Sequence, residues 1–186
     1  MSNRLVRTAA AVLGTAVVGG LLTAAPAEAA SSYQGRVTTS VLTVRHLPTT
    51  ASASEGTTKL GQTIQIVCKV RGTTVAGNNI WYALPPTLNE WVSARYVDNL
   101  GPAPRWCGTE ARWAGKANAA LNKRVAPTTA AAKAGSLAKG QSMSIICKLN
   151  GQNVGGNPRW YYLTDGRWVA ARYVDNIGVG APAWCN

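Results

Sequence analysis

The residues best suited to ligand chemistry in this sequence are aromatic and basic, and they occur in two matching sets. The first set is Trp81, Tyr82, Trp91, Arg95 and Tyr96, and the second is Trp160, Tyr161, Trp168, Arg172 and Tyr173, with Tyr162 as an extra ring. A flat ring with a polar tip suits sugar faces, peptide backbones and proline-rich segments. A guanidinium offers paired donors to carboxylates or phosphates. These residue types therefore predict a binding surface.

The same residues have a structural interpretation that stays open, because aromatic side chains also fill cores. Neighbouring residues of a strand point to opposite faces, so we expect one ring of each Trp-Tyr pair to face solvent. We expect Trp91 and Trp168 to belong to the core. Arg95 and Arg172 either pack on the adjacent rings or are solvated surface arginines.

The sequence offers little that catalysis requires. Its one histidine, His46, is matched by Val125 in the second set, so no Ser-His-Asp or Cys-His arrangement repeats. Paired carboxylates of the glycosidase kind are not indicated, since only Asp98 and Asp175 recur, one per set. We expect these two residues to lie in turns or caps. No C-x-x-C pair is present to hold a metal. We therefore predict no enzyme activity, no metal and no cofactor.

The two sets belong to a long internal repeat. The segment Trp91–Gly101 returns as Trp168–Gly178 with nine of eleven positions identical, and the match continues upstream at an offset of 79 residues. A repeat of this length is a small domain rather than a solenoid unit. Two linked copies favour a bivalent binder over an enzyme, because linkage raises avidity without new chemistry. The predicted repeats are residues 33–107 and 113–186, joined by a linker at 108–112 so short that we expect the domains to touch.

The four cysteines occupy equivalent places in the repeats. Three pairings are formally possible for four cysteines. The duplication favours Cys68–Cys107 and Cys147–Cys185, because each unit then closes on itself. A bridge over this separation contributes about 4 kcal/mol in the chain-entropy model. Small units with limited cores often need such support, and oxidised cysteines fit a secreted chain.

The first 29 residues have the pattern of a signal peptide. Arg4 and Arg7 precede an apolar stretch from Ala9 to Ala25, and Ala27–Ala29 fits a cleavage site. The alternative is an uncleaved membrane anchor; no later apolar run is long enough to span a bilayer. Cleavage would lower the formal net charge from +12 to +11. Such a surplus favours polyanions outside the cell, wall polymers or acidic lipids rather than nucleic acid, or serves solubility alone.

The patterns that position these residues are typical of β-structure. Apolar residues alternate along Ile64–Val70 and Met143–Leu149, which predicts half-buried strands with a cysteine on the core face. Further strands are predicted over Ile80–Leu84 and Arg159–Leu163, and Asp165-Gly166 indicates a hairpin turn after the latter. We expect Ala51–Gly56 and Ala130–Gly135 to be exposed loops. Short strands in units of this size predict two all-β small barrels.

The order of the motifs resembles bacterial SH3-like (SH3b) domains. The opening pattern is L-x-V-R…P-[ST], which the first repeat has from Leu42 and the second has from Leu121 with Lys123 in place of the apolar residue; both repeats close on W-V-[SA]-x-x-Y, from Trp91 or Trp168. The sequence departs from the family at Leu47, Ala126 and Lys123, and adds the tails Trp106-Cys107 and Trp184-Cys185. The resemblance covers both repeats. It implies two tandem, disulfide-bonded SH3-like β-barrels and a cell-wall association module that binds peptidoglycan peptide or glycan.

Taken together, the sequence predicts a secreted or extracellular, non-catalytic protein that associates with the bacterial cell wall. The alternatives are an extracellular protein-binding or enzyme-inhibitor module and a structural component without a ligand. The predicted binding residues are Trp81, Tyr82, Arg95, Tyr96, Trp160, Tyr161, Tyr162, Arg172 and Tyr173.

Overall fold

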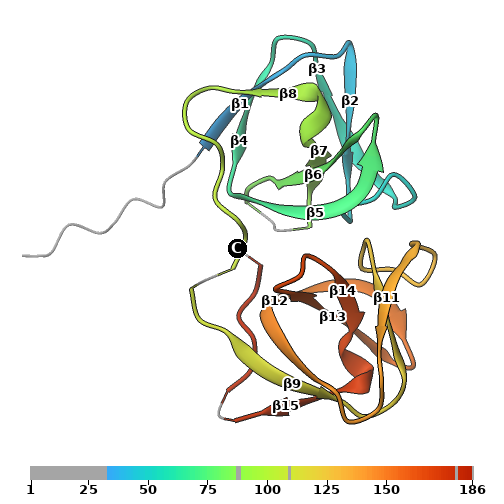
Figure 1. Cartoon of the computed structure of the whole chain (residues 1–186). Helices are drawn as coiled ribbons and strands as arrows, with labels where there is room; N and C mark the ends of the chain where they lie inside the picture. Colours follow the sequence, from blue (N-terminus) through green and yellow to red (C-terminus); the bar gives the residue numbers. More distant parts are fainter. Residues whose placement is uncertain (1–32, 87–88, 109, 179, 186) are drawn as a thin grey trace, which may run out of the picture. The chain divides into compact units, whose positions relative to one another are not determined.

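The computed structural model describes residues 33–86, 89–108, 110–178 and 180–185 of the 186-residue chain (Figure 1). The predicted signal peptide, residues 1–29, lies outside the described residues. Residues 31–186 belong to one compact unit. We call residues 33–107 the first half and residues 113–185 the second half.

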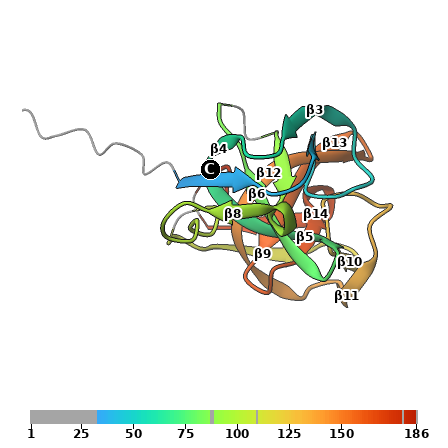
Figure 2. The ribbon, with the colours of Figure 1, turned by 90° about the horizontal axis from the view of Figure 1, so that it is seen from above.

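The described chain is built from strands, with two short 3-10 turns (Figures 1 and 2). The first half contains β1 (Tyr33–Val37), β2 (Val41–Arg45), β3 (Ser54–Lys59), β4 (Thr63–Ile66), β5 (Cys68–Val75), β6 (Asn78–Ala83), β7 (Trp91–Ser93), η1 (Ala94–Tyr96) and β8 (Val97–Asn99). The second half contains β9 (Trp113–Ala117), β10 (Leu121–Arg124), β11 (Lys133–Leu137), β12 (Ser142–Val154), β13 (Asn157–Leu163), β14 (Trp168–Ala170), η2 (Ala171–Tyr173) and β15 (Val174–Ile177). The all-β prediction is confirmed.

Both halves arrange their strands in the same order. The first half has a sheet β4-β1-β8 and a sheet β3-β2-β7-β6-β5, and all of their pairings are antiparallel. The second half has one sheet, β11-β10-β14-β13-β12-β9-β15. Its long strand β12 covers the places of β4 and β5, and so joins into one sheet what the first half divides into two.

The alternation predicted from the sequence is confirmed on these central strands. In β4, β5 and β12 the alternating apolar residues and both first cysteines are buried, while most residues between them are more exposed. Val75, Ile146 and Val154 are only partly buried. The predicted hairpin at Asp165-Gly166 is also confirmed, since β13 and β14 pair antiparallel across it and Gly166 N–H donates to the Leu163 carbonyl at 2.9 Å. β6 and β13 begin two residues earlier than predicted, at Asn78 and Asn157.

Two predictions about loops and turns are wrong. The segments expected as exposed loops, 51–56 and 130–135, are mostly exposed and begin outside any strand, but residues 54–56 and 133–135 belong to the edge strands β3 and β11. Polar and small residues there resemble a loop in sequence because an edge strand faces solvent widely. Asp98 and Asp175 are not in turns either; they lie exposed in β8 and β15.

The disulfide pairing predicted from the duplication is confirmed. Cys68 bonds Cys107 and Cys147 bonds Cys185, over sequence separations of 39 and 38 residues. Each bridge ties the C-terminal tail of its half to a central strand, next to the backbone pairings of Lys69 with Trp106 and of Lys148 with Trp184.

The apolar core consists of three clusters. One lies within the first half around Ile66, and one within the second half around Ile145. The third, which we call the shared cluster, combines residues of both halves: Leu47, Cys68, Val70, Trp81, Ala83, Trp91, Cys107, Cys147, Leu149, Trp160, Tyr162, Trp168, Ala170 and Cys185. Both disulfides belong to the shared cluster, so the expectation that the halves touch is confirmed.

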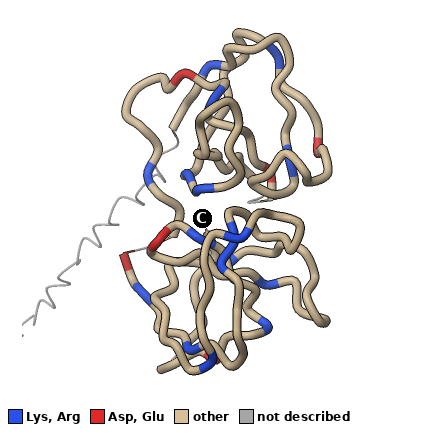
Figure 3. The backbone as a smooth tube through the Cα atoms, turned by 45° about the vertical axis from the view of Figure 1, so that its right-hand side comes forward, with Lys and Arg blue, Asp and Glu red and all other residues tan. Residues whose placement is uncertain are grey.

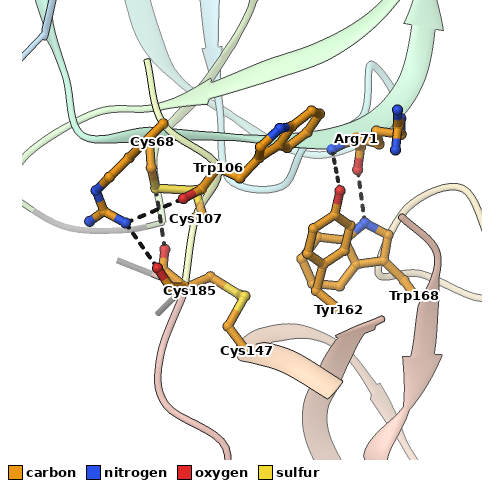
Figure 4. The surroundings of a disulfide bond; sticks show 10 residues. Cys68, Arg71, Trp106, Cys107, Cys147, Tyr162, Trp168 and Cys185 are labelled. Atoms are coloured by element: carbon orange, nitrogen blue, oxygen red, sulfur yellow. Dashed lines mark hydrogen bonds between the residues drawn. A yellow bond between two sulfur atoms is a disulfide. The ribbon is translucent and has the colours of Figure 1, made fainter. Parts of the chain in front are cut away.

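Hydrogen bonds to one residue of the first half reinforce the shared cluster (Figure 4). The Arg71 backbone N–H donates to the Tyr162 hydroxyl at 3.0 Å, and the Trp168 indole N–H donates to the Arg71 carbonyl at 2.9 Å. Cys68 Sγ lies 3.7 Å from the Cys185 carbonyl oxygen. Arg71 therefore satisfies polar groups that the aromatic side chains of the second half would otherwise bury unpaired.

Candidate functional site

Two small grooves, one in each half, are lined by the same nine positions of the repeat. The first is lined by Val41, Leu42, Thr43, Arg45, Thr50, Val75, Trp81, Ser93 and Tyr96. The second is lined by Ala120, Leu121, Asn122, Arg124, Thr129, Val154, Trp160, Ala170 and Tyr173. Their volumes are about 150 and 100 Å³. We call them the first and second Trp-floored grooves.

The floor of each groove is a buried tryptophan with its polar atom already satisfied. The Trp81 indole N–H donates to the Thr73 carbonyl, and that of Trp160 to the Gln152 carbonyl, both at 2.8 Å. A ligand would therefore meet an apolar ring edge here. Glycine next to each ring makes this possible, since a Cβ on Gly72 would come within 2.6 Å of Trp81 Cδ1.

A guanidinium is held at one side of each groove. Arg45 Nη1 donates to the Ser52 carbonyl at 2.9 Å, and Arg124 Nη1 donates to the Ala131 carbonyl at 2.7 Å. Each bond uses a fraction of the five N–H donors that a guanidinium carries. A half-buried, backbone-anchored arginine is a suitable partner for a carboxylate.

One tyrosine lining each groove, Tyr96 or Tyr173, ends a 3-10 turn and directly follows an arginine. In the first half, Ser93 Oγ accepts from the Arg95 N–H at 3.3 Å and starts η1, and the Arg95 guanidinium lies 6.0 Å from the Tyr96 ring centre. In the second half η2 begins without a side-chain cap, and Tyr173 is 38 % exposed. Arg95, Arg172 and Tyr173 are exposed, whereas Tyr96 is half-buried against the core of the first half.

The expected exposure of one ring in each Trp-Tyr pair is wrong. Both rings are buried, in Trp81-Tyr82 and in Trp160-Tyr161, and Tyr162 is buried as well. The alternation itself holds: Trp81 faces the shared cluster and Tyr82 faces the core of the first half. The second strand face is covered because the other half packs on it, which no local pattern indicates. Trp91 and Trp168 are buried, as expected.

The buried tyrosines have polar partners that the sequence did not indicate. The Tyr82 hydroxyl donates to Asn99 Oδ1 at 3.0 Å, and Asn176 Nδ2 donates to the Tyr161 hydroxyl at 3.1 Å. Burial raises the pKa of Tyr82, with the Asn99 hydrogen bond opposing it. Burial also raises the pKa of Tyr162, with the Arg71 N–H opposing it. The raised pKa keeps Tyr82 and Tyr162 neutral at pH 7.

Sequence reasoning missed the most exposed tryptophans. Trp106 is 42 % and Trp184 40 % exposed, each directly before the second cysteine of its half. Lys69 Nζ lies 5.2 Å and the Arg71 guanidinium 5.1 Å from the Trp106 ring centre. The signal was present in the sequence: a Trp-Cys tail and a Cys-Lys pair occur in both repeats.

The same arrangement occurs in the second half, with a different source for the guanidinium. Lys148 Nζ lies 5.2 Å and the Arg159 guanidinium 4.4 Å from the Trp184 ring centre. In the repeat, Arg159 stands at the place of Ile80, and Ile80 is the cross-strand partner of Arg71. In the first half the guanidinium therefore comes from β5, and in the second half it comes from β13, the equivalent of the neighbouring strand β6.

Other kinds of site are not seen in the part of the chain that the structure describes. No three His, Cys, Asp or Glu side chains gather there as a metal-binding group. No helix among those residues is long and apolar enough to cross a membrane. His46 lies 3.1 Å from Glu55, in an exposed pair.

Comparison with known proteins gives likenesses of backbone structure only. No family model and no curated protein matches the sequence. NlpC2 from Trichomonas vaginalis matches over 82 % of this chain and 52 % of its own, with 11 % identity and a TM-score of 0.29. NlpC1 from the same organism matches over 84 % and 50 %, with 9 % identity and a TM-score of 0.29. The endolysin LysPBC5 CBD matches over 78 % and 93 %, with 9 % identity and a TM-score of 0.28. This chain therefore spans about half the length of the two NlpC proteins.

Proposed function

We propose that this is a secreted, non-catalytic protein of two tandem SH3-like barrels that associates with the bacterial cell wall. The observation that supports it best is the pair of Trp-floored grooves, lined by equivalent residues in both halves. Two equivalent grooves on one chain suit a polymer with a repeating unit, because binding of both grooves at the same time raises avidity.

The size of the grooves favours peptide over glycan as the bound part of the wall. Volumes of about 150 and 100 Å³ equal the space of roughly three to five water molecules. That space accepts a short side chain and an adjoining carboxylate, and does not enclose a whole sugar ring with its substituents. In this proposal Arg45 and Arg124 pair with the carboxylate, while Tyr96 and Tyr173 cover the peptide backbone.

The charge of the protein would assist the encounter. Lys and Arg positions are spread over both halves while Asp and Glu are sparse (Figure 3), and the formal net charge of the chain is +12. Such a charge raises the rate of encounter with an anionic polymer and weakens with salt. The grooves would supply the part of the affinity that survives high salt.

Co-sedimentation with purified cell walls at low and high salt tests the proposal. We expect saturable pelleting that persists at high salt and is lost in a Tyr96→Ala/Tyr173→Ala double variant. Each single variant should lose less than half of the double variant's effect in free energy, because one groove still engages. Leu60→Ala, which removes an apolar side chain 64 % exposed and outside both grooves, is the matched control.

Two results would contradict the proposal. Pelleting that vanishes at high salt and is equal in the double variant would assign wall association to charge alone. No pelleting at either salt would exclude the wall as the ligand and favour the extracellular protein-binding alternative.

A further inference from the structure

A cleft of about 550 Å³ is separate from the Trp-floored grooves and shares no lining residue with them. We call it the Trp106 cleft. The tail of the first half supplies Arg105 and Trp106, and Arg71 lies on β5. The second half supplies Tyr162 and the hairpin glycine Gly166. Its volume lies within the usual range for small-ligand sites.

The cleft combines an exposed ring with fixed positive charge. Trp106 is 42 % exposed, so part of its ring is open to a ligand. Arg105 Nη1 donates to the carbonyls of Trp106 and Gly108 at 3.3 and 3.0 Å, which holds its guanidinium on the backbone of the cleft. Among the described lining residues there are three arginines and one glutamate, so the cleft is net positive.

Arg71 is positioned for a role at the ring. Its backbone is held by Tyr162 and Trp168, and its guanidinium lies 5.1 Å from the Trp106 ring centre. On its other side is the hairpin of the second half, where a Cβ on Gly166 would come within 2.8 Å of Arg71 Nη1. The Arg71 guanidinium is thereby kept beside the face of the Trp106 ring, where the anionic group of a ligand stacked on that ring would lie.

We propose that the Trp106 cleft binds an acidic sugar, meaning a saccharide ring that carries a carboxylate or a phosphate. The apolar face of the sugar stacks on Trp106, and its anionic group pairs with Arg71 and Arg105. This inference deepens the proposed function, since it gives the wall-binding protein a second ligand class: the small grooves take peptide and the cleft takes acidic glycan.

The chain contains its own control for this site. Trp184 has nearly the same exposure as Trp106 and also has one lysine and one arginine near its ring, but it does not line the Trp106 cleft. If an exposed tryptophan next to a cation were sufficient to bind a sugar, the sugar would bind at both Trp106 and Trp184. Binding in the cleft would appear at Trp106 only.

The test is titration of the full chain with small sugars, followed by NMR of the indole N–H signals of its seven tryptophans. The probes are N-acetylmuramic acid, which carries a carboxylate, N-acetylglucosamine 6-phosphate, and neutral N-acetylglucosamine. We expect saturable shifts of the Trp106 signal with one or both acidic sugars, and at least about tenfold weaker binding of the neutral sugar. The two acidic probes separate carboxylate from phosphate as the recognised group.

Variants then assign the binding to named side chains. Arg71→Gln keeps the backbone bonds of Arg71 and should weaken the acidic sugar by about tenfold. Trp106→Leu should abolish saturable binding, observed through the remaining signals. Arg159→Gln and Trp184→Leu, the matched changes in the second half, should leave the affinity unchanged.

Four outcomes would overturn the inference. Equal shifts at Trp106 and Trp184 would indicate general ring contact, and equal affinity for neutral and acidic sugars would exclude the arginines. Tighter binding of adenosine monophosphate than of either sugar would make the ligand a nucleotide. Wall pelleting that persists while the sugars fail to bind would leave the proposed function standing and reject this cleft alone.

Discussion

At the scale of single residues, Tyr162 has a structural role that its position in the sequence did not indicate. The sequence predicts it as a ligand contact because it is an extra ring; in the structure its ring is buried and its hydroxyl accepts from the Arg71 N–H at 3.0 Å. Its ring centre lies 4.6 Å from that of Trp168, whose indole N–H donates to the Arg71 carbonyl. One residue of the first half is thus bound through both backbone groups by two rings of the second half.

We predict that Tyr162→Phe lowers the free energy of unfolding at pH 7 by about 1 to 2 kcal/mol, because the partly buried Arg71 N–H loses its acceptor. Chemical denaturation measures this. Tyr173→Phe, at an exposed ring, is the control and should change stability by less than about 0.5 kcal/mol. Equal small effects in both variants would show that the Arg71 bond contributes nothing.

The same residue gives the protein a sensitivity to alkali. The pKa of Tyr162 is raised from its ordinary value of 10.0 by burial, so the unfolded chain releases this proton at a lower pH than the folded chain does. Below pH 10 both states hold the proton and stability is unaffected; above it the unfolded state binds fewer protons and stability falls. Tyr162→Phe should therefore show a shallower loss of stability than the unmodified protein above pH 10, where Tyr82 still contributes.

At the scale of elements, the β13–β14 hairpin has a role beyond reversing the chain. Asp165-Gly166 forms the turn, and Lys123 Nζ lies 2.7 Å from Asp165 Oδ2. Gly166 has a φ of +75° and lies against the Arg71 guanidinium. The turn therefore needs glycine for two reasons, its backbone conformation and the close approach of a side chain.

Paired substitutions separate these two reasons. Gly156 has a φ of +86° with nothing within 4 Å of a built Cβ, so Gly156→Ala should lower stability by the backbone strain alone, about 1 to 2 kcal/mol. We predict that Gly166→Ala lowers stability by the same amount and also displaces Arg71, which should shift the indole signal of Trp106 in NMR. A shift in Gly156→Ala, or none in Gly166→Ala, would contradict this contact.

At the scale of the whole molecule, the two halves share a core instead of standing apart. The shared cluster contains four buried tryptophans and both disulfides, drawn from both halves. Separating the halves would expose this cluster to water, at about 25 cal/mol for each Å² of apolar surface. Loss of one half therefore removes stabilisation from the other.

We predict that thermal unfolding of the oxidised protein follows a single transition, with a calorimetric enthalpy equal to the van 't Hoff enthalpy. Differential scanning calorimetry measures both. Two resolved transitions, each with about half of the total enthalpy, would show that the halves unfold independently and that the shared cluster couples them weakly.

The sequence by itself determined the features that depend on short-range pattern and on the duplication. Alternating residues around Cys68 and Cys147 predicted the central strands, the hairpin followed from Asp165-Gly166, and the repeat selected the disulfide pairing. These features were predictable because strand period and turn chemistry depend on neighbouring residues. The disulfide pairing was predictable because one repeat can be compared with the other. The all-β class followed from them.

Only the tertiary structure decided which faces of the strands meet water. The outward member of each Trp-Tyr pair was predicted to be exposed, yet Trp81 and Trp160 are buried in the shared cluster while Trp106 and Trp184 remain half-exposed. Strand alternation states that two neighbours face opposite ways, but not what lies on either side. That depends on the packing of residues about 90 positions apart, as in the 91- and 97-residue separations from Arg71 to Tyr162 and Trp168, and such contacts leave no periodic trace in the chain.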